Sequence, residues 1–326
     1  MTQAVYEKIT DRIISALEAG EIPWKKPWSG GSGGRPVNLK SGKPYKGINT
    51  VLLGFGHSYE SPFWLTYKQA KAFGGWVKRG EKGTQIVFWN WSEKEVLNEK
   101  GEKDKRRFAF LKTYTVFNSE QCEHLCRSKI LKEWEEAKAN AKVKKFNPIK
   151  ECEKIVAKYK GAPEVGHDGG DRAYYNILSD SIHLPKRELF DSEQEYYSTL
   201  FHEFAHSTGS KGRLGRDGIV GHRSHQAYSE EELVAEFAAA FLCGRAGIEP
   251  AIEKNSTAYI KGWLKTFKGD KKIALVAAAA AQKASDYVLG ELEGWSFRGK
   301  SPKKKAVKKA VKKAKAKSKK VAKKAS

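Results

Sequence analysis

Residues 200–209, L-F-H-E-F-A-H-S-T-G, constrain what this chain can fold into more than any other stretch. His202 and His206 stand four residues apart, so on a helix their imidazoles lie on one face, one turn apart. Two neutral imidazoles so placed can hold a divalent metal ion, and Glu203 lies where it can take a proton from a metal-bound water. This is the H-E-x-x-H arrangement of zinc hydrolases, which predicts Glu203 as the general base.

The flanking residues place the motif on a helix. Residues 193–206 have an apolar side of helical period, formed by Tyr196, Tyr197, Leu200, Phe201 and Phe204. Gly209 stands at a plausible C′ position, where many helices end. In the metzincin class of zinc hydrolases a third histidine follows that glycine by three residues. Gly212 occupies this position, so the metzincin class is excluded.

The third protein ligand is expected from a second helix over residues 229–244, with Ser229 as its N-cap. Glu232 and Glu236 are four residues apart and share a helix face. One of them can bind the metal while the other orients a ligating histidine. The run E-L-V-A-E resembles the E-x-x-A-D/N element of gluzincin-like metallopeptidases, which implies Glu232 as the ligand and Glu236 behind it. His222 and His225 are competing ligands in a basic, glycine-containing stretch.

The cofactor predicted for this site is Zn²⁺, with Mn²⁺ or Co²⁺ as alternatives. Four cysteines, Cys122, Cys126, Cys152 and Cys243, form no C-x-x-C pair, so neither a zinc ribbon nor a redox motif is indicated and reduced intracellular thiols are expected. The N-terminus lacks the apolar core of a signal peptide. The apolar run at residues 273–281 is too short to span a membrane. A cytoplasmic protein without membrane contact is expected.

Positive charge is concentrated in two parts of the chain. The formal net charge is +23, which suggests a polyanionic partner. Residues 300–326 contain 14 lysines and no acidic residue, and residues 1–120 contain 20 basic and 12 acidic residues. The Lys/Ala repeat of the tail resembles the tails of linker-histone-like proteins. It is expected to be disordered alone and to bind duplex DNA through phosphates.

The N-terminal part predicts a helix followed by small mixed elements. Residues 3–19 have a helical apolar stripe and end at Gly20, and a loop rich in proline and glycine follows. The other elements are expected as a helix after Asn49, a short helix at 67–73, strands from Val77 and at 85–91, a charged hairpin tip at 93–107 and a strand after it. Later elements are expected as a helical connector at 121–162, an edge strand or hairpin at 172–185, and two closing helices at 257–267 and 270–289.

Aromatic residues alternate with lysine and arginine before residue 120, where six of the nine tryptophans lie. This combination suits single-stranded nucleic acid, because bases stack on rings while cations neutralise phosphates. The residues predicted to contact DNA are Trp24, Lys25, Lys26, Trp28, Arg35, Asn38, Tyr45, Lys46, Asn49, Trp64, Tyr67, Lys68, Lys78 and Lys82. Trp76, Phe88 and Phe110 are expected in the core instead, because their neighbours alternate as those of buried strand residues do.

Several long motifs resemble ArdC-type antirestriction proteins. The N-terminal ones are I-T-D-R-I-I-S-A-L-E-A-G-E-I-P-W-K-K-P-W, G-K-P-Y-K-G-I-N, W-L-T-Y-K-Q-A and V-K-R-G-E-K-G. The C-terminal ones are D-S-I-H-L-P, Y-Y-S-T-L-F-H-E-F-A-H-S-T-G, E-E-L-V-A-E-F-A-A-A-F-L and Y-I-K-G-W-L-K. The resemblance covers about residues 3–290. It implies that the N-terminal domain binds single-stranded DNA and that the protein shields incoming plasmid or phage DNA from host restriction.

The expected fold class is α+β, with a small N-terminal single-stranded-DNA-binding α+β domain, a zincin-like metallopeptidase domain and a disordered basic tail. The boundaries are expected as 1–120, a connector at 121–162, the metallopeptidase domain at 163–298 and the tail at 299–326. The expected partners are single-stranded DNA, duplex DNA at the tail and a protein substrate of the peptidase domain. The alternative function is a protease of DNA-bound proteins that resembles the SprT-type repair proteases, with the N-terminal domain as a tether.

Overall fold

The computed structural model describes residues 2–24, 35–54, 59–97, 103–125, 128–139, 148–168, 170–220, 225–250 and 256–292. The described residues up to Gly290 form one compact unit. The Lys/Ala tail, Lys25, Lys26, Trp28 and His222 lie outside the described residues. What the sequence predicts for them therefore stays a prediction, as do the domain boundaries.

The described helices follow the helical patterns in the sequence. They are α1 (Thr2–Glu18), α2 (Ile48–Gly54), α3 (Tyr67–Ala72), α4 (Lys129–Ala139), α5 (Pro148–Lys158), α6 (Glu193–Ser207), α7 (Asp217–Val220), α8 (His225–Ala246), α9 (Ser256–Gly269) and α10 (Ile273–Val288), with short 3₁₀ turns at Ser119–Gln121 and Arg187–Leu189. Helix α1 ends where Gly20 adopts a φ of +81°, a conformation that glycine reaches without steric cost. Among the described residues, no helix has the length and apolar character needed to cross a membrane.

The N-terminal sheet is built on a long hairpin. Its strand order is β1 (Val37–Asn38), β2 (Phe63–Leu65), β5 (Lys103–Asn118) and β4 (Thr84–Leu97). Strands β4 and β5 pair antiparallel over the full length of β4, from Thr84 opposite Val116 to Leu97 opposite Lys103. The charged tip is therefore shorter than the sequence suggested, because the ladder is made by backbone groups and continues through charged residues. A separate antiparallel pair joins β3 (Trp76–Val77) to β6 (Cys122–Glu123).

A smaller sheet lies in the C-terminal half. Its order is β7 (Glu164–Gly166), β9 (Ser181–His183) and β8 (Tyr174–Asn176), so β8 is an edge strand of the described sheet. Strands β8 and β9 pair antiparallel, which confirms the hairpin expected at 172–185. Its free edge leaves backbone N–H and C=O groups open to another extended chain.

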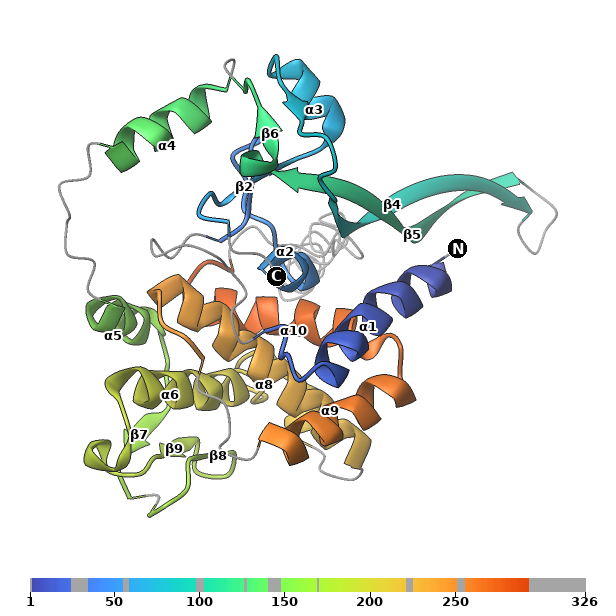
Figure 1. Cartoon of the computed structure of the whole chain (residues 1–326). Helices are drawn as coiled ribbons and strands as arrows, with labels where there is room; N and C mark the ends of the chain where they lie inside the picture. Colours follow the sequence, from blue (N-terminus) through green and yellow to red (C-terminus); the bar gives the residue numbers. More distant parts are fainter. Residues whose placement is uncertain are drawn as a thin grey trace, which may run out of the picture. The chain divides into compact units, whose positions relative to one another are not determined.

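Helix α8 packs against both α6 and α10 (Figure 1). Its residues from Leu233 to Gly244 are buried apart from Glu236, which is partly exposed. A helix that is apolar on all sides is typical of the centre of a helical layer. The polar exceptions on such a helix therefore lie in a position to form a site.

The N-terminal helix belongs to the same packed unit. Helix α1 packs along α9, and Ile9, Ile13 and Leu17 share a hydrophobic cluster with residues of α8, α9 and α10. Lys268 and Lys271 form ion pairs with Glu18 and Asp11 at 2.7 and 2.6 Å.

Candidate metal centre and nucleic-acid surface

Helix α6 carries the H-E-x-x-H motif, as predicted. Its N-terminus is capped by the Ser192 side chain, which accepts a hydrogen bond from the backbone N–H of Glu195. Gly209 follows the helix without a positive φ, so it is not the left-handed C′ residue expected. It provides space instead, because a Cβ there would lie 2.8 Å from Ile219 Cδ1 and 2.9 Å from an Arg216 guanidinium nitrogen.

Helix α8 carries the acidic residues of the site. It begins at His225, so Ser229 lies inside the helix and is not its N-cap, contrary to the prediction. The preceding residues Gln226 and Ala227 are compatible with a helix, and packing of the whole helix extends it beyond the local cap signal. Glu231, Glu232 and Glu236 all fall on this helix, opposite α6.

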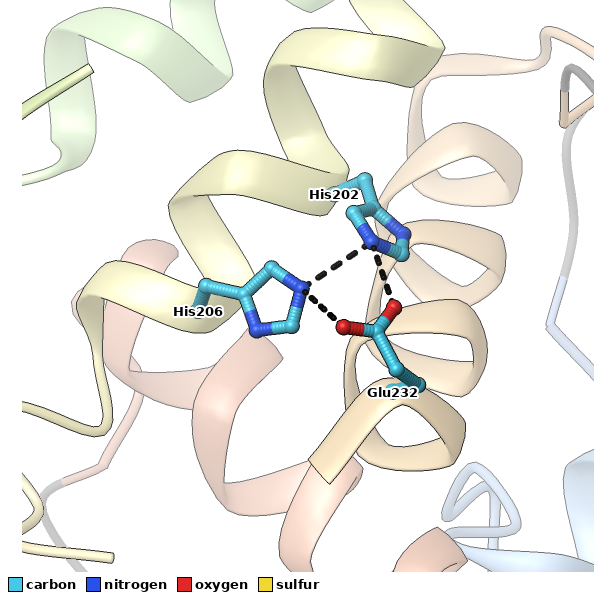
Figure 2. A group of neighbouring side chains, drawn as sticks. All are labelled: His202, His206 and Glu232. Atoms are coloured by element: carbon cyan, nitrogen blue, oxygen red, sulfur yellow. Dashed lines mark hydrogen bonds and ion pairs between the residues drawn. The ribbon is translucent and has the colours of Figure 1, made fainter. Parts of the chain in front are cut away.

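Three ligand atoms of α6 and α8 converge (Figure 2). The Nε2 atoms of His202 and His206 are 3.1 Å apart. The Glu232 carboxylate places Oε2 3.5 Å from His202 Nε2 and Oε1 3.5 Å from His206 Nε2. Among the described residues, these three side chains form the group whose ligand atoms lie within 4.8 Å of one another.

These separations fit a tetrahedral metal ion. Zinc binds imidazole nitrogen and carboxylate oxygen at about 2.0–2.2 Å, which places two ligand atoms of a tetrahedron about 3.3–3.6 Å apart. The Nε2 atoms lie 3.1 Å apart, and each lies 3.5 Å from one of the two Glu232 oxygens, close to that value. Two histidines and one carboxylate leave a fourth position for water, as in catalytic sites of this class. The pair of histidines and Glu232 thus fit the ligand set that the sequence predicts.

Glu231 is a member of the site that the sequence analysis missed. It is buried, and its Oε1 lies 3.4 Å from His206 Nδ1, on the ring side away from Glu232. Arg216 donates hydrogen bonds to both Glu231 oxygens, at 2.9 and 2.6 Å, and to the end of α6 at Thr208 Oγ1 and the Ala205 carbonyl, both at 2.7 Å. In the sequence, only the position of Glu231 next to Glu232 in the run E-E-E indicated that Glu231 could belong to the site.

Burial and hydrogen bonding shift the pKa values of these groups in opposite directions. Burial alone would raise the pKa of Glu231, but hydrogen bonds from Arg216 and His206 outweigh it and lower that pKa. The pKa of Glu232 is lowered in the same way by His202 and His206 against the effect of burial. Burial would lower the pKa of His206, whereas hydrogen bonds to Glu231 and Glu232 raise it to about 10. At each of these three groups the hydrogen-bonding partners thus outweigh the effect of burial on the pKa.

Glu236 lies one turn after Glu232 on α8, and its predicted role behind a ligating histidine stays a prediction. Burial raises the pKa of Glu236, and the neighbouring His202, Tyr259 and Trp24 oppose this rise. The competing ligands are not tested, since His222 and the side chain of His225 lie outside what the structure describes.

A cleft of about 290 Å³ opens over the three ligands. Its lining residues are Ala173, Tyr174, Tyr175, Ile177, His202, Glu203, His206, Ile219, Glu231 and Glu232. Glu203 and the ligands thus share one cavity with the edge strand β8. An extended chain paired with β8 would pass over the ligand cluster.

Three aromatic residues predicted to stack on DNA have their rings in the core. Trp24, Tyr45 and Trp64 are only 1%, 5% and 2% exposed, so the expectation of open ring faces is wrong for them. Trp24 packs edge-on against Phe237 and Trp263 at 5.1 and 6.1 Å. Trp24 packs in a core with residues of α8 and α9, and Tyr45 and Trp64 pack with Ile86 and Val116, contacts that local composition does not reveal.

Several predicted polar DNA contacts have internal partners instead. Asn49 is buried and exchanges two hydrogen bonds with the backbone of Val87, at 2.8 and 2.9 Å. Lys46 forms an ion pair with buried Asp286 at 2.8 Å, and Asn38 donates to the Tyr45 hydroxyl at 3.1 Å. Arg35 is also buried. The contacts of Asn49, Lys46 and Asn38 thus join separate segments of the fold.

Other predicted contacts remain on the surface. Tyr67, Lys68, Lys78 and Lys82 are exposed. Trp76 and Phe88, which the sequence assigned to the core, are 46% and 44% exposed, so that assignment is wrong, and Phe110 is half-buried. Phe88 and Phe110 lie in the hairpin of β4 and β5, which is buried at Val87 and Leu111 but open elsewhere, whereas Trp76 lies in the short strand β3.

The exposed face of β4 and β5 carries an aromatic cluster that the sequence analysis missed. Phe88 and Tyr114 lie edge to face with ring centroids 5.7 Å apart, and Tyr45 supports Phe88 at 6.4 Å. Lys112, directly opposite Phe88 in the ladder, places its ammonium 5.6 Å from the Tyr114 ring centroid. We call Phe88, Lys112 and Tyr114 the hairpin cluster.

Comparison with known proteins agrees with both halves of the structure. The model described as the N-terminal domain of anti-restriction factor ArdC matches residues 3–117, and that of a zincin-like metallopeptidase matches residues 150–281. The metal-free crystal structure of the antirestriction ArdC protein from the R388 plasmid is 36% identical, with a TM-score of 0.70 over 89% of this chain and 98% of that one. Its Mn(II)-bound structure is 34% identical, with a TM-score of 0.66 over 89% and 99%.

Curated relatives match over a similar span. DNA primase TraC of Escherichia coli is 36% identical over 87% of this chain, which covers only 27% of that protein's length. An uncharacterised protein of Sinorhizobium fredii, y4eC, is 30% identical over 87% of this chain and 91% of its own length. The agreement of two family models, near-complete coverage of a solved antirestriction protein and an intact H-E-x-x-H centre identifies this chain as a member of the ArdC antirestriction family with a zincin-like metallopeptidase domain.

Proposed function

We propose that the centre formed by His202, His206 and Glu232 binds a divalent metal and hydrolyses peptide bonds. The convergence of their three ligand atoms in the cleft that Glu203 also lines supports this proposal most directly. Zn²⁺ is the metal we propose, since two imidazoles and one carboxylate are a catalytic zinc ligand set. Mn²⁺ is the alternative, because the similar ArdC protein has a Mn(II)-bound structure.

The residues of the cleft have separate roles in the proposed hydrolysis. A bound metal supplies Lewis-acid chemistry and lowers the pKa of a coordinated water to about 7. Glu203 is placed to take the proton from that water and to pass it to the leaving amine. Strand β8 offers backbone groups that would align an extended peptide across the ligands. Glu231 and Glu236 keep the two imidazoles oriented from behind.

We also propose that the N-terminal half binds single-stranded DNA and that the protein protects incoming plasmid or phage DNA from restriction in the cytoplasm during transfer. The hairpin cluster supports this, because Phe88 and Tyr114 expose ring surface beside the Lys112 cation, and bases stack on such rings. The Lys/Ala tail adds charge for duplex DNA. In this proposal the buried Trp24, Tyr45 and Trp64 no longer contact DNA. The exposed Tyr67, Lys68, Lys78 and Lys82 still do.

The alternative is a protease of DNA-bound proteins in which DNA binding only tethers the enzyme. A Glu203→Gln variant separates the two functions, since it removes the proposed base and keeps the ligands. Restriction digests of single-stranded and duplex DNA are run with wild type and variant, beside a peptidase assay on a denatured protein substrate. Protection retained by the inactive variant supports direct shielding. Protection lost with peptidase activity supports the protease, and absence of hydrolysis by the metal-loaded wild type contradicts the proposed peptidase.

A further inference from the structure

Three residues in register form a row across the small sheet of the C-terminal half. Gly166 of β7 and Tyr174 of β8 each pair with His183 of β9. Residues directly opposite each other on neighbouring strands point to the same face of a sheet. The row ends at Tyr174, on the edge strand of the described sheet, and Tyr174 also lines the cleft that contains the metal ligands.

Tyr174 and His183 are stacked across the two strands. Their ring centroids are 4.8 Å apart, and their planes are inclined by 14°. His183 thus covers the face of the tyrosine ring that is turned toward the inside of the sheet. The other face is turned toward the edge of the described sheet, and Tyr174 is 44% exposed. Open ring surface therefore lies on the side where an extended chain would pair with β8.

Hydrogen bonds at both ring nitrogens fix the orientation of His183. Its Nδ1 donates to Asp168 Oδ1 at 2.8 Å, and its Nε2 lies 2.8 Å from Ser181 Oγ. Ser181 Oγ in turn lies 2.7 Å from Ser179 Oγ. Gly166 leaves room for the Asp168 carboxylate, because a Cβ at Gly166 would lie 2.8 Å from Asp168 Oδ1. These contacts hold the imidazole in place and, through it, the tyrosine ring stacked on it.

We propose that Tyr174, positioned by His183, determines the substrate specificity of the peptidase by binding an aromatic side chain of an extended peptide on its open ring face. The peptide residue opposite Tyr174 would extend the row by one position, with the two Cβ atoms about 4.5–5.5 Å apart. An aromatic side chain at this position gains more than the burial of an aliphatic one, because the two rings also interact with each other. The inference rests on the proposed peptidase function and names its substrate class, which is extended protein segments that contain aromatic residues.

The position of Tyr174 in the cleft explains why a substrate is the expected occupant. The edge strand and the metal ligands share one cavity, so a chain paired with β8 would also pass over the ligands. Tyr175 is the other tyrosine among the described lining residues. It packs against the hydrophobic core beside α6, and its hydroxyl donates to Asp180 at 2.7 Å. Tyr174 therefore offers the ring that is available to a substrate side chain.

The test begins with the metal-loaded full-length protein and a denatured protein substrate, whose cleavage sites are mapped by mass spectrometry. Phenylalanine, tyrosine and tryptophan should be enriched at one fixed position relative to the cleaved bonds. A peptide that spans one of these sites is then made with either phenylalanine or leucine at that position. For wild type, kcat/KM should be about two- to tenfold higher for the phenylalanine peptide, the gain expected from one aromatic pair.

The ratio of the two kcat/KM values is then compared among variants. It should fall to about one in Tyr174→Leu and stay at the wild-type value in Tyr174→Phe, because the ring makes the contact. His183→Ala should lower the ratio in part, since it removes the ring behind Tyr174. His167→Ala is the matched control, because His167 stacks on Tyr196 with planes inclined by 13° and neither of these two residues lines the cleft. Each ratio compares two substrates on one preparation, so a smaller folded fraction does not change it.

Several results would overturn the inference. They are a wild type without aromatic enrichment, an unchanged ratio in Tyr174→Leu, a lost preference in Tyr174→Phe and an equal loss in His167→Ala. If Tyr174→Leu does not fold, Tyr174→Thr decides, because threonine suits a strand. Hydrolysis without preference would leave the proposed peptidase intact. Absence of hydrolysis by the metal-loaded wild type would overturn the peptidase and, with it, the role of Tyr174.

Discussion

Arg216 donates to both oxygens of Glu231, and Glu231 in turn lies 3.4 Å from His206 Nδ1. The same guanidinium contacts Thr208 and the Ala205 carbonyl at the end of α6. One arginine thus holds the second ligand histidine and the end of its helix in place. Planar, bidentate pairing of this kind is specific to arginine.

Replacing Arg216 with lysine should weaken metal binding although the positive charge remains. Lysine is a point donor and cannot hold both Glu231 oxygens and Thr208 together. Partners behind a metal ligand contribute about 10–100-fold in affinity, so we expect a loss in that range by chelator competition. Arg213→Lys is the control, since Arg213 donates to Asp180 and to the Ser207 carbonyl at the end of α6 but to no acidic residue of the site. Equal losses in both variants would assign the effect to the fold alone.

The proposed ligands predict which single-residue variants lose bound metal and which keep it. His202→Ala, His206→Ala and Glu232→Ala should each lower bound metal, measured by atomic absorption after dialysis. Glu203→Gln should keep it, because a general base is not a ligand. Full occupancy in Glu232→Ala would transfer the ligand role to Glu236 or to one of the competing histidines.

The stability of the chelator-treated protein should fall as the pH rises above neutrality. The pKa of His206 is raised to about 10 in the folded protein, against about 6.5 for an unfolded chain. A raised pKa stabilises the fold fully below the unfolded value, and this contribution disappears as the pH rises through the folded value. Thermal unfolding between pH 6 and 10 should show a steeper decline for wild type than for His206→Gln. Parallel pH profiles would contradict this.

Single-stranded DNA affinity should depend on the hairpin cluster. Phe88→Ala and Tyr114→Ala should each weaken single-strand binding by about 1–3 kcal/mol if one base stacks there, with little effect on duplex binding. Tyr174→Ala is the control, because Tyr174 is equally exposed, at 44%, but lines the metal cleft. Fluorescence anisotropy with a labelled oligonucleotide provides the measurement. A loss shared by both DNA forms would contradict stacking.

Removing residues 300–326 should make DNA binding less dependent on salt. The deletion takes away 14 lysines, and every phosphate that the protein no longer neutralises reduces the slope of log affinity against log salt concentration. Binding is measured from low to moderate salt for both DNA forms. An unchanged slope would mean that the tail does not bind phosphate.

Local sequence determined the part of the metal centre that is local in space. His202, Glu203 and His206 lie within two turns of one helix, so their spacing alone places them together. The second helix was readable from its apolar pattern, but that pattern left Glu232 and Glu236 as alternatives, and only the resemblance to the gluzincin-like element favoured Glu232. From such local patterns the helices α1, α6, α9 and α10 and the hairpin of β8 and β9 were predictable within a few residues.

Tertiary structure decided which polar and aromatic residues serve the fold and which remain available. Trp24 and Tyr45 stand in proline- and glycine-rich sequence yet are buried, while Phe88 alternates like a core residue and is exposed. Burial depends on which distant elements cover a side chain, and composition does not encode that packing. The same holds for Arg216 and Glu231, whose hydrogen bonds form only when the loop after α6 packs on α8. Arg216 and Glu231 therefore meet because the helices pack together, and their positions in the sequence do not predict this contact.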